Sequence, residues 1–126
     1  MILLLTDDQT NWLNRQIKRI ENGKQNPKLA YKSGENVFTQ FVEQSVEIKE
    51  ALNRASGNSN QIILSRNNAR AIQLAARSTA EVLILVVVPG YQEKISEGLP
   101  VEKYLKNATA MAQSLFDLGN EIERNL

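Results

Sequence analysis

One stretch, residues 59–90, constrains the fold of this chain more than any other. It contains the most apolar run of the protein, Val82 to Val88, which Pro89-Gly90 follows directly. At about 100° per residue, its apolar and small residues fall on one side of a helix. These residues are Leu64, Ala71, Ile72, Ala75, Ala76, Thr79, Val82, Leu83 and Val86. The spacing predicts an amphipathic helix that becomes wholly buried near its end and stops at Pro89-Gly90.

The opposite side of this predicted helix is polar and carries Arg66, Arg70, Gln73 and Arg77. A row of guanidinium groups suits contacts with the phosphates of a nucleic acid or a bidentate clamp on carboxylates. The alternative is that the arginines pair with an acidic helix face or lie in water. The candidate nucleic-acid or anion-binding residues are Arg15, Lys18, Arg19, Arg66, Arg70 and Arg77.

Capping signals mark the starts of the other helices. Thr6-Asp7-Asp8-Gln9 has the pattern of a capping box, in which the Thr hydroxyl and the Gln side chain satisfy free backbone N–H groups. Asn26-Pro27 is a second start signal, although Gly34 also allows that helix to begin near Glu35. Pro100 suits the first turn of a last helix, and Gly119 late in that helix indicates a close crossing.

These signals predict an all-α fold, an antiparallel bundle of four main helices in a single domain, 1–126. The helices are expected near residues 7–22, 27–55, 60–88 and 100–125, and residues 91–97 are expected to form a short fifth helix or an ordered loop. The predicted core consists of Trp12, Ile17, Ile20, Phe41, Ile48, Leu52, Ile72, Ala76, Leu83, Val86, Leu105, Met111, Leu115 and Ile122.

The rival interpretation is an α/β fold. Ile2 to Leu5, Ile62 to Leu64 and Val82 to Val88 are short apolar runs that suit buried parallel strands. In that fold Asp7 and Asp8 would lie at the carboxyl end of a strand, where open α/β sheets bind ligands. The helical spacing that continues from Leu64 through Val86 favours the all-α interpretation.

Composition removes several kinds of chemistry. The chain has no Cys and no His, so it lacks thiolate ligands, imidazole ligands and the commonest general base. Its glycines are dispersed and form no phosphate-binding loop. We therefore predict no catalytic, cofactor-binding or metal-binding residues and no enzyme activity.

The leading hypothesis for function is a non-catalytic protein-interaction module, an adaptor or assembly subunit that binds a protein partner or its own copy. The apolar excess at Val82 to Val88 supports it. A nucleic-acid-binding protein is the second hypothesis, although a net charge of +1 is low for that class. The third is a small α/β ligand-binding or catalytic domain. We expect a cytoplasmic, soluble protein and no membrane span, because residues 69–88 carry Arg70, Arg77 and Glu81.

Overall fold

The protein is an all-α molecule, whose described residues form four main helices and one two-stranded ribbon, and the helix contacts are compatible with a bundle. The structure, a computed structural model, describes residues 1–25, 35–55 and 60–126. In chain order the elements are β1 (Ile2–Leu4), α1 (Asp7–Gln25), α2 (Glu35–Ala55), β2 (Gln61–Ile63), α3 (Arg66–Val82), η2 (Leu83–Val87), α4 (Val88–Ser96) and α5 (Glu102–Asn125). The segments α3, η2 and α4 form one continuous helix, Arg66–Ser96.

The ribbon corrects the prediction of a helix from residue 60. β1 and β2 pair antiparallel, with Leu3 opposite Ile62. Alternation explains the strands, because the central residue of each is buried and its neighbours are exposed. The rival interpretation was right about these two short strands but wrong about a parallel sheet, and its third strand, Val82 to Val88, is helical.

Both helices that follow the ribbon begin at a side-chain cap. At the start of α1, Gln9 N–H donates to Thr6 Oγ1 at 3.1 Å and Thr6 N–H donates to Gln9 Oε1 at 3.0 Å, which confirms the predicted capping box. At the start of α3, Asn68 N–H donates to Ser65 Oγ at 3.1 Å. Ser65 has extended backbone angles, so the helix cannot reach back to residue 60.

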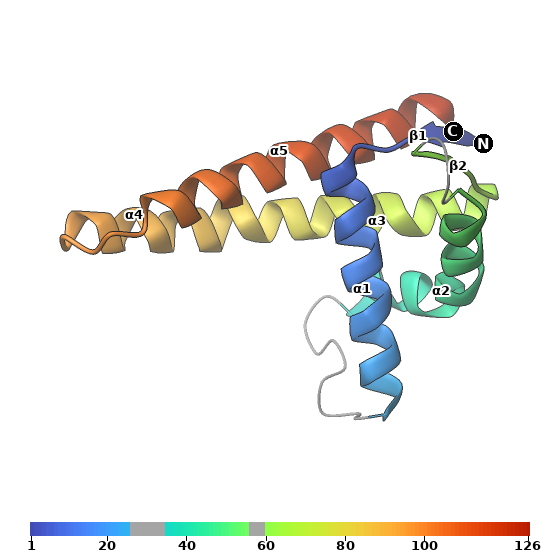
Figure 1. Ribbon diagram of the computed structural model, residues 1–126, viewed down its shortest axis with the longest axis horizontal. Coiled ribbons are helices and arrows are strands. Elements are labelled where there is room, and N and C mark those ends of the chain that lie inside the picture. The colour runs from blue at the N-terminus through green and yellow to red at the C-terminus, as the bar shows by residue number, and fades with distance from the viewer. Residues whose placement is uncertain (26–34, 56–59) are drawn as a thin grey trace.

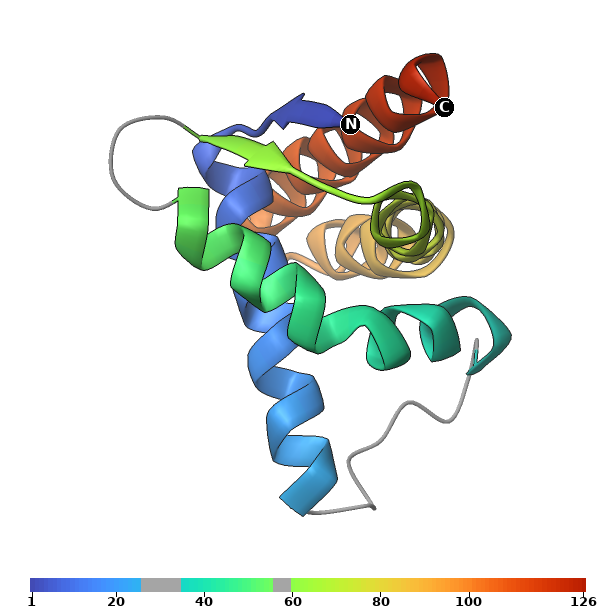
Figure 2. The same ribbon diagram turned by 90° about the vertical axis from the view of Figure 1, so that its right-hand side faces the viewer.

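The core lies where α1 and α2 pack against one end of the hairpin formed by α3 and α5 (Figures 1 and 2). The Trp12 and Phe41 rings, from α1 and α2, lie 6.5 Å apart between centroids. Gly119 is buried, and a Cβ there would lie 2.9 Å from Cγ of Arg77, which confirms the close crossing predicted at Gly119 and identifies α3 as the partner helix. This packed end of the molecule, with the ribbon, is called the body below.

Most of the predicted core is confirmed. The buried members are Trp12, Ile17, Ile20, Phe41, Ile48, Leu52, Ile72, Ala76, Leu115 and Ile122. Leu83, Leu105 and Met111 are only partly buried. The prediction that Val86 lies in the core is wrong, since Val86 is 64% exposed. Val86 is exposed because the long helix extends past the part of the molecule where α1 and α2 pack against it (Figure 1).

The start of the second helix and the end of the long helix were both predicted from Pro and Gly signals. The second helix was predicted from residue 27 or from near Glu35. The structure has α2 at Glu35–Ala55, and residues 27–34 lie outside the described part of the chain. The predicted stop at Pro89-Gly90 is wrong, because the helix continues through these two residues to Ser96.

Candidate interaction surface

The long helix and α5 extend beyond the body as an antiparallel pair, which we call the arm, residues 82–110 (Figure 1). Within the described residues, η2 and α4 make their extensive contacts with α5 and with the adjoining parts of their own helix. None of the residues of η2 or α4 is fully buried. The most apolar run of the sequence is therefore held by a single neighbouring helix.

A π-turn at Leu83–Val87 explains how the helix passes Pro89. Proline has no N–H, and its ring clashes with the carbonyl four residues earlier, here that of Leu85. The preceding turn widens, so the N–H of Val88 bonds to the carbonyl of Leu83, five residues back. The extra residue also corrects the direction of the side chains. In a regular α-helix, side chains four positions apart are rotated about the helix axis by about 40° relative to each other, and the wider turn offsets this rotation.

The corrected phase gives the arm a continuous seam. Leu83, Val87, Tyr91 and Ile95 are all partly buried, and α5 is the neighbouring helix that contacts η2 and α4. The Tyr91 ring stacks on Tyr104 of α5, with centroids 6.0 Å apart and planes inclined by 22°. Gly98, with φ of 87°, then ends α4, and its N–H donates to the Ile95 carbonyl at 2.9 Å.

The arm leaves a group of aliphatic side chains in solvent. The exposed fraction is 52% for Val82, 39% for Ile84, 73% for Leu85 and 64% for Val86. We call Val82, Leu85 and Val86 the arm patch. Val82 and Val86 continue the side of the helix on which Ala71 and Ala75 are buried in the body. The apolar side of the long helix is thus covered at its base and open in the arm.

The outer side of α5 in the arm has a different character. Its exposed residues are mostly charged or polar, namely Glu102, Lys103, Lys106, Asn107, Thr109 and Ala110. Residues 82–92 of the long helix, in contrast, contain no charged residue. The two sides of the arm therefore differ, and the exposed aliphatic group that suits an apolar partner, Val82, Leu85 and Val86, lies on the long helix.

The structure brings two members of the predicted arginine row of α3, Arg70 and Arg77, close to one carboxylate. Arg70 Nη1 and Arg77 Nη1 lie 3.8 and 3.7 Å from Glu123 Oε2 of α5. Arg66 Nη2 donates to the Leu126 backbone oxygen at 3.1 Å. The arginines therefore pair with α5, a partner that the sequence pattern did not identify, because the pattern shows that the row is basic and not which helix packs beside it.

A shallow pocket lies beside this row, with a volume of about 490 Å³. It is lined by Arg66, Asn67, Arg70, Glu123 and Leu126. An anion entering it would meet the Glu123 carboxylate as well as the arginines, and like charges repel. The pocket is therefore a poor anion site.

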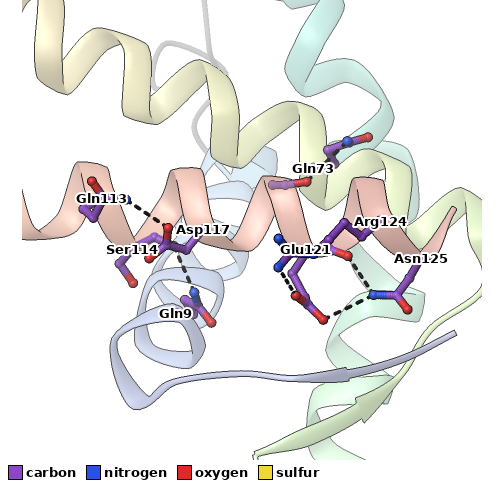
Figure 3. Close-up of polar contacts among 9 residues, drawn as sticks. Gln9, Gln73, Gln113, Ser114, Asp117, Glu121, Arg124 and Asn125 are labelled. Carbon is purple, nitrogen blue, oxygen red and sulfur yellow. Dashed lines mark hydrogen bonds and ion pairs between the residues drawn. The ribbon is translucent and has the colours of Figure 1, made fainter.

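Gln73 was expected on the polar, outward side and is fully buried instead. It accepts from Arg70 Nη1 at 2.6 Å, and its Nε2 donates to Glu123 and, at 3.4 Å, to the Gly119 carbonyl. Gln9 anchors α5 from α1, donating to the Ser114 carbonyl at 2.9 Å (Figure 3). Two buried amides thus hold α5 from two different helices.

The remaining candidates, Arg15, Lys18 and Arg19, lie on the exposed side of α1. Arg15 and Lys18 line a second open pocket of about 450 Å³ together with Glu21 and Lys49, which form an ion pair at 2.6 Å. The six candidates are thus divided between α1 and α3. Among the described residues, no group of acidic side chains is arranged to hold a metal ion.

The outer face of the ribbon is a smaller apolar surface. Ile2, Leu4 and Ile63 are all more than half exposed. The alternation that buries Leu3 and Ile62 necessarily turns these neighbours outward.

Comparisons of the chain with protein-family models, with curated proteins and with solved structures found no match.

Proposed function

We propose that this protein is a non-catalytic interaction module, an adaptor or subunit of a larger assembly, that binds a protein partner through the arm patch. The observation that carries the proposal is the exposure of Val82, Leu85 and Val86 on a helix that projects from the body. Burying one such side chain is worth about 1.5–3 kcal/mol. A partner that covers all three gains several kcal/mol from this small area.

The nucleic-acid alternative has less support. Arg70 and Arg77 share the Glu123 carboxylate, so a phosphate would have to displace an existing acceptor. The α/β alternative loses its basis, because the chain is all-α and Asp7 lies in the first turn of a helix, where Asn60 Nδ2 donates to its carboxylate at 2.8 Å. We therefore retain the interaction module.

A lipid surface is a different way of covering apolar residues. By length and composition alone, the helix Arg66–Ser96 could span a membrane, although core helices of soluble proteins pass the same test. Its first half carries Arg70 and Arg77 and is packed in the body, so a span would have to take these charges into the bilayer or leave the body. We therefore favour a protein partner over lipid.

Site-specific photocrosslinking in cells that make the protein tests this proposal. A benzoyl-phenylalanine at position 86 is expected to yield adducts with protein, because the partner covers the arm patch. The same group at position 110, on the outer side of α5, is the matched control and is expected to yield none. Leu85→Lys should abolish the adducts from position 86. Absence of protein adducts at 86, or equal yields at both positions, would refute the proposal.

A further inference from the structure

We infer that the partner which covers the arm patch is a second copy of this chain, so that two arms pack against each other in a symmetric dimer. This inference rests on the proposed function and identifies its partner. The arm consists of two antiparallel helices. The arm of a second copy would supply two more helices of the same length, and the four together would form a four-helix bundle.

Charge supports a second copy as the occupant. Residues 82–92 carry no charge, and their flanks hold Glu81 at the base and both Glu93 and Lys94 toward the tip. A partner on this surface must be uncharged over a similar length, because a charge buried there would have no counter-ion. An identical arm meets this condition at every position of the patch.

The two-sided character of the arm limits the assembly to two copies. A dimer with two-fold symmetry uses the same patch on both subunits and leaves no second apolar side of the arm for further growth. The outer side of α5, with Lys103, Lys106 and Gln113, stays in solvent. A closed dimer is therefore expected, and neither a ring nor a filament.

The size of the arm sets the strength of the dimer. η2 and α4 comprise 5 and 9 residues, and at 1.5 Å per residue they span about 20 Å. Two helices, each about 10 Å wide, give the arm a face of roughly 400 Å² in projection. Stable interfaces bury about 800 Å² per partner, about twice this area, so the arm alone gives a weak, reversible dimer below the standard size.

Sedimentation equilibrium of the purified full chain over a wide concentration range tests this inference. The wild type is expected to show a reversible monomer–dimer equilibrium. Leu85→Lys and Val86→Lys should each raise the dimer dissociation constant at least about 100-fold, because each places two ammonium groups in the interface. Both side chains are exposed, so these variants should keep the helical circular dichroism of the wild type. Ala110→Lys is the matched control and should leave the dissociation constant unchanged.

Because the chain has no Cys, single cysteines give a second readout. Under mild oxidation, Val86→Cys is expected to form a covalent dimer much faster than Ala110→Cys. A wild type that stays monomeric throughout, or a dimer unaffected by Leu85→Lys, overturns the inference.

Two further outcomes separate this inference from the proposed function. In the first outcome, position 86 forms adducts only with a different protein and the wild type is monomeric. This result would refute the inference that the partner is a second copy, but the proposed interaction module would stand. In the second outcome, the chain floats with phosphatidylglycerol vesicles, Leu85→Lys abolishes this flotation, and position 86 forms no protein adducts. This result would assign the arm patch to lipid and refute both the interaction module and the second copy.

Discussion

At the scale of single residues, the most consequential side chain of the body is Gln73. It is fully buried and joins Arg70, the Gly119 carbonyl and Glu123 across α3 and α5. A hydrogen bond to a charged group contributes more than one between neutral groups. The amide therefore sets how the two helices of the hairpin meet in the body.

Gln73→Leu should lower the free energy of unfolding by about 1–2 kcal/mol, since Arg70 and Glu123 can regain water only in part. The measurement is urea unfolding followed by circular dichroism. Gln113→Leu is the control, because Gln113 bonds Asp117 on the exposed side of α5 and its loss should change stability by less than about 0.5 kcal/mol. Equal effects of the two substitutions would contradict this role for Gln73.

Glu121 shows a purely local electrostatic effect. A hydrogen bond from Arg124, together with its positive charge, lowers the pKa of the Glu121 carboxyl below its usual value (Figure 3). Because the pKa of Glu121 is lower in the folded than in the unfolded chain, this pair stabilises the fold at pH values above the unfolded-state pKa of Glu121. The contribution is lost as the pH falls through the folded-state pKa of Glu121. The carboxyl is exposed, so the contribution to stability is small.

Arg124→Ala should raise the pKa of Glu121 toward its usual value, measured by an NMR titration of the side-chain carboxyl carbon. Lys106→Ala removes a positive charge from the far part of α5 and should leave the pKa of Glu121 unchanged. A Glu121 pKa that does not respond to Arg124→Ala would show that Arg124 does not set it.

At the scale of elements, two glycines of the arm have opposite roles. Gly98 ends α4 with φ of 87°, a conformation that a side chain disfavours. Gly90 lies inside the helix with an ordinary φ, and a Cβ there would meet nothing within 4 Å. The same substitution is therefore expected to act in opposite directions at the two positions.

Gly98→Ala should destabilise the protein by about 1 kcal/mol, and Gly90→Ala should stabilise it by about 0.4–1 kcal/mol, because alanine restricts the unfolded chain and favours helix. Thermal unfolding of the two variants beside the wild type measures both. Each variant is the control for the other, since both add one methyl group to the arm. Changes of the same sign would contradict the assigned conformations.

At the scale of the whole molecule, stability should be graded along the hairpin. Ala71, Ile72, Ala75 and Ala76 of α3 are buried in the body, whereas no residue of η2 or α4 is. Segments with little buried apolar surface open locally at low cost. The arm is thus the part of the hairpin least stabilised within a single copy.

Amide hydrogen exchange at low protein concentration should therefore be fast in η2 and α4 and slow in the first half of α3. Mass spectrometry of peptides along the long helix measures this gradient. Peptides from the buried part of α5 serve as the internal reference, because they should remain protected at every concentration. Uniform protection along the helix at low concentration would contradict the gradient.

The sequence by itself determined the local structure wherever the cause was local. Thr6 with Gln9 set the start of α1, and the spacing of small and aliphatic residues made Val82 to Val88 helical. Most of the core followed from the same spacing. A capping box and a helical phase depend on neighbours within a few residues, and for this reason they can be predicted without coordinates.

The tertiary structure decided what each helical face meets. Residues 61–63 form a strand because the distant segment Ile2–Leu4 pairs with them, and Pro89 is accommodated because one extra residue keeps the seam against α5. Val86 was predicted in the core and lies in solvent, since only the path of the chain determines where α1 and α2 stop covering the long helix. Helical spacing shows that a face is apolar, but only tertiary packing decides whether the same chain covers it.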